Sequence, residues 1–235
     1  MNFFNRIISK FISCYYIFIA KARPSFAQVG EDAILYYLFH NAGMRNISYL
    51  DIGTNHPVYG NNTYAFYLFG GKGVCVEPDP ALFKIVKKIR SNDTCLNVGI
   101  GLNEQSEADF YVFSNSGWNT FSPEEASLRK NSGMPYDKVL RIPLKNINDI
   151  ISNHFNNPPD IISIDVEGLD FEILKSLDFN KNAPKVLVIE TLRFGETTKA
   201  MKHEELIEFV CKNGYFIYAD THVNTIFCKN NFFDK

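Results

Sequence analysis

One stretch decides the fold: Ile47-Ser-Tyr-Leu-Asp-Ile-Gly-Thr-Asn-His-Pro57. Its first six residues are mostly apolar and bounded by polar residues, which predicts a buried strand over residues 47–52. Gly53 then permits a tight turn and a close approach of the backbone to a ligand. A carboxylate and a glycine turn at the end of a buried strand are typical of the ligand-binding edge of an α/β sheet.

The same alternation of short apolar runs and amphipathic stretches continues along the chain. Strands are expected over residues 47–52, 73–76, 95–99, 108–113, 139–143, 161–164, 186–189, 215–218 and 225–228. Helices are expected over 28–39, 61–69, 80–90, 147–154, 171–177 and 203–213, with a short helix after the polar loop 114–122. The continuous apolar run 186–189 predicts burial on both faces, hence a mostly parallel sheet between two layers of helices. The last two strands are expected to form a hairpin.

Composition narrows the classes of function. The chain has 235 residues, of which 46% are hydrophobic, which is enough for a full core. Its 24 Lys and Arg against 26 Asp and Glu give a net charge of -2, which argues against a general nucleic-acid binder. The five cysteines are scattered singly without metal-binding spacing, which favours a reducing, cytoplasmic compartment.

The first 25 residues form a segment apart from the domain expected over residues 26–235. Residues 1–22 place Phe and Ile at helical spacing opposite a face that carries Arg6 and Lys10, which predicts an amphipathic helix. Such a helix suits the inner membrane surface, as a peripheral contact, or a partner protein. Packing on its own domain, dimerisation with a second copy and a signal peptide remain alternatives. No stretch reaches the length of a membrane span, since Arg6, Lys10 and Lys21 interrupt the only candidate.

Four expected strands end in a carboxylate: Asp51, Glu77, Asp165 and Glu190. If the sheet is parallel, all four lie at one edge, although each alone also fits a helix cap. The turn after Asp51 lacks the glycine triplet of a pyrophosphate site and the Gly-Lys-Ser/Thr ending of a P-loop. That disfavours an NAD-type oxidoreductase and favours a nucleoside ligand without phosphates, namely S-adenosylmethionine.

Five stretches carry a resemblance to a known family. They are Gln28-Val-Gly-Glu-Asp32, Asp51-Ile-Gly-Thr-Asn-His-Pro57 with Asn62-Thr-Tyr64, Glu77-Pro78, Ile164-Asp-Val-Glu-Gly168 with Asp170, and Val188-Ile-Glu190. In this order they resemble the FkbM family of S-adenosylmethionine-dependent methyltransferases. The resemblance implies a class I, Rossmann-like fold with seven strands, mostly parallel, the last antiparallel. It also implies methyl transfer to oxygen, typically to a hydroxyl of a sugar or glycan precursor.

The resemblance also implies roles for the residues that bind the cosubstrate. By that resemblance Asp51, Gly53 and Asn55 hold the methionine end and Glu77 accepts hydrogen bonds from the ribose. Asn97 and Val98, at the end of the third strand, are expected near the adenine.

Methyl transfer to a hydroxyl needs an acceptor for the hydroxyl proton. His56 and His222 are candidates, because imidazole titrates near neutral pH and both are expected on loops at this edge. Asp165 and Glu167 are further catalytic candidates, with the alternative that Glu167 only caps a helix. Together with Glu190, Asp165 also offers oxygen ligands for a Mg2+ ion, a second alternative for this edge.

The loop 114–120 carries Trp118, the only tryptophan in the chain. An indole beside Asn and Ser is suited to stacking on a sugar ring, and it equally suits a packing anchor for the loop. From a different class, a membrane-associated scaffold without catalysis remains open, with a vestigial pocket and residues 3–20 as its anchor. The four carboxylates argue against that interpretation.

Overall fold

The computed structural model describes residues 24–102, 105–194 and 200–234. The amphipathic helix expected over residues 1–22 lies outside the described residues, so its alternative interpretations stay predictions. The expected division at residues 25 and 26 lies at the margin of the described chain and also stays a prediction.

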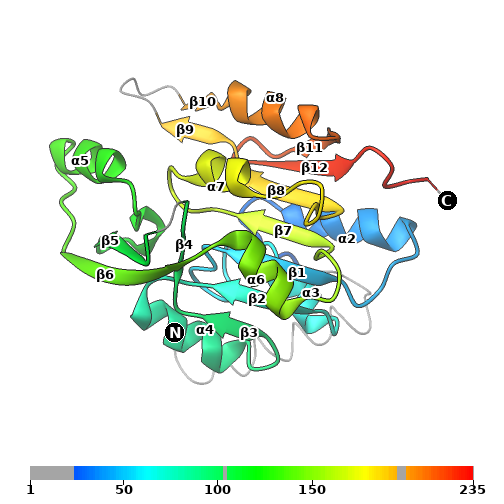
Figure 1. Cartoon of the computed structure of the whole chain (residues 1–235), viewed down its shortest axis with the longest axis horizontal. Coiled ribbons are helices and arrows are strands. Elements are labelled where there is room, and N and C mark those ends of the chain that lie inside the picture. The colour runs from blue at the N-terminus through cyan, green and yellow to red at the C-terminus, as the bar shows by residue number, and fades with distance from the viewer. Residues whose placement is uncertain (1–23, 103–104, 195–199, 235) are drawn as a thin grey trace.

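The centre of the protein is a seven-stranded sheet in the order β11-β12-β8-β7-β1-β2-β3 (Figure 1). Its strands are β1 (Ser48–Ile52), β2 (Lys72–Val76), β3 (Thr94–Leu96), β7 (Ile161–Ile164), β8 (Val186–Glu190), β11 (Tyr215–Asp220) and β12 (Asn224–Lys229). β12 runs antiparallel to both of its neighbours, β8 and β11, while the pairings among the other strands are parallel. This is the expected class I methyltransferase arrangement, including the terminal hairpin.

Helices cover both faces of this sheet. One face is covered by α6 (Ile147–His154), α7 (Asp170–Ser176) and α8 (Glu204–Lys212), which lie in front in Figure 1. The other face is covered by α2 (Glu31–Asn41) and α3 (Tyr64–Leu68). Along β1, Leu50 and Ile52 enter the first hydrophobic cluster and Tyr49 enters the second, as the alternation of a strand requires. Burial of each such side chain contributes about 1.5–3 kcal/mol.

Side-chain caps fix where several helices begin. α4 (Pro80–Ile89) starts behind Asp79, whose carboxylate accepts the N–H of Ala81 at 2.7 Å. The helix expected over 61–69 is shorter, because the side-chain oxygen of Asn61 accepts the N–H groups of Thr63 and Tyr64 and forms a turn instead. The helix expected from residue 28 begins at Glu31, after Gly30 with φ of 96°.

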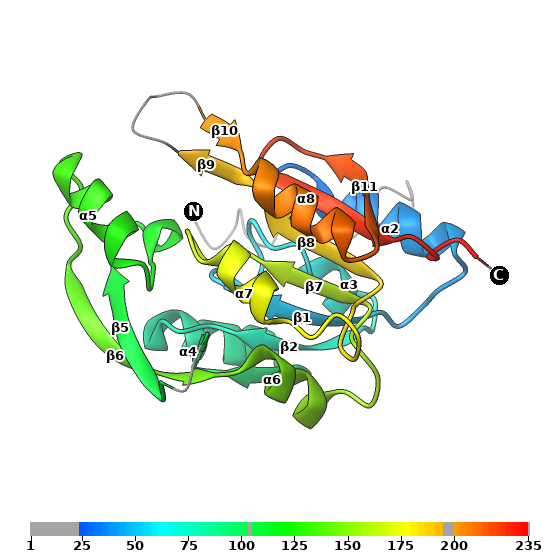
Figure 2. The same ribbon diagram turned by 45° about the horizontal axis from the view of Figure 1, so that its top comes forward.

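An arm leaves the sheet after β3. It consists of β4 (Gly99–Ile100), β5 (Glu107–Val112), the 3-10 turn η1 (Ser116–Trp118), α5 (Pro123–Asn131) and β6 (Lys138–Lys145). β6 lies between β4 and β5 in a separate three-stranded sheet, and Figure 2 shows this arm beside the carboxyl ends of the parallel strands. The single strand expected over 95–99 is therefore wrong. At the break, Asn97 donates its side-chain amide to the carbonyl oxygens of Glu77 and Pro78, both at 2.8 Å.

A second small sheet pairs β9 (Leu192–Phe194) with β10 (Ala200–Lys202), a hairpin that the sequence did not predict. It follows β8 directly and leads into α8. None of the helices in the described residues is long and apolar enough to cross a membrane.

Candidate functional site

The four strand-end carboxylates lie along one edge of the sheet. Asp51 is in β1, Glu77 follows β2, Asp165 follows β7 and Glu190 ends β8. These four strands are neighbours in the order β8-β7-β1-β2 and run in the same direction. The edge that the sequence predicts is therefore assembled by parallel pairing.

The turn after β1, residues 53–57, is held between two other strand ends. The N–H groups of Gly53 and Thr54 donate to the carbonyl of Val76 at 3.0 and 3.1 Å. Gly53 has φ of 80°, and a Cβ atom placed on it would lie 1.8 Å from the carbonyl oxygen of Asp165. Only glycine fits this position, for reasons of both conformation and space.

Glu77 ties this turn to the start of α4. Its two carboxylate oxygens accept the N–H groups of Asn55 at 2.7 Å and Asp79 at 2.8 Å, and the residue is 4% exposed. Burial raises the pKa of Glu77 to about 7. Each oxygen of a carboxylate has a second lone pair, so the side chain can still accept hydrogen bonds from two ribose hydroxyls. The expected ribose role stays a prediction.

Asp51 is buried and faces the segment between the turn and α3. Its Oδ2 accepts hydrogen bonds from the Asn61 amide at 2.9 Å and the Thr63 hydroxyl at 2.8 Å. Burial raises the pKa of Asp51, and the nearby Arg90 guanidinium opposes that shift. Asp51 thus organises the segment beside the turn, and its expected contact with the methionine end stays a prediction.

The adenine candidates lie at the exit of β2. Asn97 holds the carbonyls of Glu77 and Pro78, as described above, and Val98 is buried in the first hydrophobic cluster with Val76. The structure brings Asn97 next to Glu77, and the expected contact of both residues with adenine stays a prediction.

The two histidines occupy different kinds of turn. His56 Nδ1 accepts the N–H groups of Val58 and Tyr59 at 3.2 and 3.1 Å, so only its Nε2 is left for a ligand. His222 lies in the exposed turn between β11 and β12, where its backbone N–H donates to the Asp220 carboxylate at 2.7 Å. Neither geometry selects a base, and both roles stay predictions.

Asp165, Glu167 and Glu190 form an acidic cluster, with one carboxylate oxygen of each within 4.8 Å of the others. Burial and the neighbouring carboxylates raise the pKa of Asp165 well above its usual range and that of Glu190 to about 10. Because these two carboxyl groups lie close together and both pKa values are raised, we expect the pair to hold a proton at neutral pH. Burial also raises the pKa of Glu167 to about 7, although Arg129 donates to it at 2.7 Å.

Two buried amides contact or belong to the strands next to the acidic cluster. Asn62 donates to the Ser163 hydroxyl at 3.2 Å, and Asn224 donates to Glu31 at 2.9 Å. Ser163 lies two residues before Asp165 on the same face of β7, and Asn224 pairs with Glu190 across β12 and β8. The side-chain oxygens of both amides are buried without a hydrogen-bond partner in the described chain. They add two oxygen acceptors to this region.

The arm contacts three of the strand ends through side chains. Ser116 donates to Asn55 at 3.0 Å, Asn119 to Asp79 at 3.3 Å, and Thr120 to the carbonyl of Glu167 at 2.8 Å. Arg129 donates to Glu167 and also to the carbonyl of Trp118. The arm therefore forms a wall of the site, with Trp118 in it.

Arg129 is a site residue that the sequence pattern did not indicate. It lies on α5, a polar helix whose residues look like ordinary surface, and its partner Glu167 is 38 residues away along the chain. Glu167 itself has φ of 56°, a left-handed conformation that its residue type does not signal, although Gly168 after it marks a turn. No local pattern in the sequence could have found this pair.

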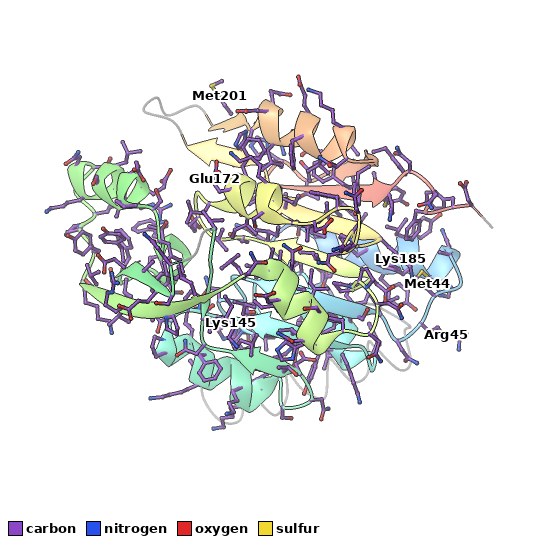
Figure 3. The ribbon with its side chains drawn as sticks, viewed as in Figure 1. Met44, Arg45, Lys145, Glu172, Lys185 and Met201 are labelled. Carbon is purple, nitrogen blue, oxygen red and sulfur yellow. The ribbon has the colours of Figure 1, made fainter. Side chains whose placement is uncertain are left out.

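A hollow of about 1010 Å³ lies at the opposite end of the sheet. Ser48, Lys72 and Lys185 line it, at the amino ends of β1, β2 and β8. Figure 3 shows Lys185 and Met44 on the side away from the arm. Ligands of such sheets bind at the carboxyl ends, so the candidate site is the edge that holds the carboxylates.

The acidic cluster predicts a pH-dependent gain in stability for Glu190→Gln. Because the folded pKa of Glu190 is about 10 and its ordinary value is 4.5, the folded protein holds this proton more tightly than the unfolded chain. The stabilisation of the folded protein by this bound proton is complete below pH 4.5 and is lost as the pH rises toward 10. Glutamine keeps the neutral shape at every pH, so the Tm of the variant relative to wild type should rise from about pH 6 to about pH 9.

The matched control for that measurement is Glu208→Gln, which removes an exposed carboxylate paired with Lys212 on α8. Its Tm relative to wild type should change little over the same pH range. A Tm difference for Glu190→Gln that stays constant over that range would contradict the shared proton.

The chain is similar to one family of known proteins. The family model described as Methyltransferase FkbM domain matches residues 51–217. No curated protein matches the chain. Among solved structures, the FkbM methyltransferase of Methylobacillus flagellatus is 14% identical, with a TM-score of 0.45 over 78% of this chain and 43% of that one. The O-methyltransferase of Bacillus cereus is 13% identical, with a TM-score of 0.44 over 89% of this chain and 84% of that one. A putative RNA methyltransferase of Pyrococcus horikoshii is 12% identical, with a TM-score of 0.43 over 85% and 83% of the two chains.

Proposed function

Because the chain belongs to the FkbM methyltransferase family, we propose that it transfers the methyl group of S-adenosylmethionine to a hydroxyl of a sugar or glycan precursor. The observation that carries this proposal is the edge itself. There the Gly53 turn is held against the carboxyl ends of β2 and β7, beside the buried carboxylate of Glu77. A turn of this kind, without phosphate-binding glycines, suits an adenosine whose tail is an amino acid.

The reaction needs alignment and the removal of one proton. The acceptor oxygen attacks the methyl carbon in line with the sulfonium sulfur, the carbon–sulfur bond breaks, and the hydroxyl proton passes to a base. Among the candidates, Glu167 is best suited to that task, because its pKa of about 7 matches a base that works near neutral pH. Asp165 shares a proton with Glu190, and His56 has one ring nitrogen engaged in its own turn.

Glu167→Gln tests this assignment. With labelled S-adenosylmethionine and a panel of neutral, amino and acidic sugars, we expect the wild type to methylate at least one acceptor. The variant should lose about 100-fold or more in kcat, because the amide cannot accept the proton. Its affinity for S-adenosylhomocysteine should stay unchanged, since Glu77 and the Gly53 turn are untouched.

The control is Glu172→Gln on α7, five residues further along the chain (Figure 3). Its exposed carboxylate pairs with Lys175. It should leave kcat and affinity at wild-type values. Equal turnover by Glu167→Gln and wild type would contradict the role of Glu167 as the base. Binding of S-adenosylhomocysteine without transfer to any acceptor would favour the scaffold with a vestigial pocket.

A Mg2+ ion is a second proposal for the same cluster. The donor set fits it in kind, because Asp165, Glu167 and Glu190 all offer carboxylate oxygens, which are hard donors. A divalent ion would lower the pKa of the acceptor hydroxyl and orient it. Transfer that is lost in EDTA and restored by Mg2+ would support this proposal, and transfer that is indifferent to EDTA would reject it.

For the first 25 residues, we propose a peripheral contact with the inner membrane surface or dimerisation with a second copy of the chain. The alternation of Phe and Ile with basic residues supports it. In flotation with anionic liposomes, the full chain should float with the liposomes, whereas a version that lacks residues 1–22 should not. Equal partitioning of the two proteins would reject the membrane contact.

A further inference from the structure

A fully buried arginine lies beneath the proposed cosubstrate turn and has no part in the chemistry above. Arg90 follows α4 directly and is 0% exposed. Its guanidinium lies over the rings of Tyr49, Tyr64 and Tyr67, with 5.0–5.7 Å between its central carbon and the ring centroids. Burial of a cation costs free energy unless the cation is paired and hydrogen-bonded. The contacts of the Arg90 guanidinium therefore indicate its structural role.

We propose that Arg90 is the positioning residue of the cosubstrate turn: it holds the chain between Pro57 and Thr63 in the conformation that binds S-adenosylmethionine. This inference rests on the proposed function, because it assigns a role within the same site.

The guanidinium spans both sides of the loop that follows the Gly53 turn. One nitrogen, Nη1, donates to the side-chain oxygen of Asn61 at 3.2 Å and lies 3.5 Å from the carbonyl of Pro57. The other, Nη2, donates to the hydroxyl of Thr63 at 3.0 Å. The rigid fork of a guanidinium therefore sets the separation of these segments.

The same two residues connect Arg90 to the strand-end carboxylate. Asn61 and Thr63 both donate to Asp51 Oδ2, at 2.9 and 2.8 Å. The Asn61 amide also lies 3.3 Å from the carbonyl of Thr54, inside the turn itself. If the guanidinium moved, Asn61 and Thr63 would therefore move with it, and their hydrogen bonds to Asp51 and Thr54 would change.

The other end of Arg90 is anchored in the sheet. Its Nε donates to Asp93 at 2.8 Å, and both side chains are completely buried. Asp93 in turn accepts the Tyr49 hydroxyl at 2.9 Å and the N–H of Gly73 at 3.0 Å. Because Tyr49 and Gly73 belong to β1 and β2, Arg90 links the rigid centre of the sheet to the loop that must receive the ligand.

Arg90→Lys tests the proposal, because lysine keeps the charge but cannot make the forked contacts with Asn61, Thr63 and Asp93 together. We expect the variant to bind S-adenosylhomocysteine about tenfold or more weakly by calorimetry at 25 °C. In the ligand-free protein, amide hydrogen exchange over residues 53–63 should rise, while the sheet strands keep their protection. The control is Arg141→Lys, an exposed arginine of β6 that pairs with Glu107 and Asp109.

Thr63→Val supplies a second, milder variant and a test against a purely structural role. It removes the hydroxyl between Arg90 and Asp51 and keeps the shape of the side chain. If Arg90 acts through Thr63, the two substitutions should not act independently. The fold loss of affinity in the double variant, Arg90→Lys with Thr63→Val, should then be smaller than the product of the fold losses in the two single variants. The proposal would be overturned if the affinity loss of the double variant equalled the product of the two single losses. It would also be overturned if the Arg90→Lys protein bound the ligand as tightly as wild type, with unchanged hydrogen exchange over residues 53–63.

The two hypotheses fail separately. A wild type that does not bind S-adenosylhomocysteine would refute the proposed function, while the exchange measurement would still report whether Arg90 orders the loop. If Arg90→Lys does not fold, the Thr63→Val variant decides: a loss of affinity supports the proposal and wild-type affinity overturns it.

Discussion

Glu77→Ala is expected to abolish measurable binding of S-adenosylhomocysteine, a loss of about 100-fold or more in affinity. Two effects add in the same direction. The variant removes the acceptor proposed for two ribose hydroxyls, and it frees the N–H groups of Asn55 and Asp79, which hold the Gly53 turn and the start of α4. Each lost hydrogen bond to a charged group costs about 1.5–3 kcal/mol. Isothermal titration calorimetry measures the effect directly.

The control for this variant is Glu107→Ala, which removes an exposed carboxylate of β5 that pairs with Arg141. It should bind like wild type. Affinity of Glu77→Ala within about threefold of wild type would contradict the ribose assignment.

The same residue predicts how affinity changes with pH. Since burial raises the pKa of Glu77 to about 7, the side chain is largely protonated at pH 6 and ionised at pH 8. The ionised form accepts hydrogen bonds on both oxygens, so affinity should rise from pH 6 to pH 8. The contribution of Glu77 to stability has the opposite sign, because the folded protein favours the proton and that stabilisation is lost as the pH rises through 7.

Gly53→Ala is expected to lower the free energy of unfolding by roughly 3 kcal/mol or more and to remove ligand binding. Two physical costs combine at this position. An alanine at φ of 80° is strained by about 1–2 kcal/mol, and its Cβ would lie 1.8 Å from the carbonyl oxygen of Asp165. Because that oxygen belongs to the backbone of a neighbouring strand end, the overlap can be relieved only by separating β1 from β7. Urea unfolding measures the change.

Gly60→Ala separates these two costs. Gly60 has φ of 66° and no atom within 4 Å of the position of a Cβ, so its alanine variant carries the conformational strain alone. It should lose about 1 kcal/mol. Equal losses for the two variants would show that the close approach of Gly53 to β7 does not constrain the fold.

Much of the fold could be predicted because its signals are local. The run at residues 186–189 is apolar throughout and forms β8 with both faces buried, and the expected terminal hairpin is present as β11 and β12. Parallel strands must place their carboxyl ends together, so Asp51, Glu77, Asp165 and Glu190 could be assigned to one edge from strand pattern and order along the chain.

Two of the exceptions lie where a side chain replaces a backbone partner. Asn97 ends β3 by donating to two carbonyls of the β2 exit, and Asn61 delays the start of α3 by accepting two N–H groups. Asparagine competes with regular structure in this way only when a particular neighbour is in reach. Propensity and periodicity do not contain that information.

By itself, the sequence determined the class of sheet, the edge that carries the candidate site and the four carboxylates on that edge, because strand period, burial and strand direction follow from local patterns. Tertiary structure alone decided which distant side chains contact the residues of this edge. Arg90 reaches back 27 residues to Thr63, and Arg129 reaches forward 38 residues to Glu167. The sequence around an arginine carries no sign of such a distant partner, since the energy of the contact depends on distance and desolvation that exist only once the chain has folded.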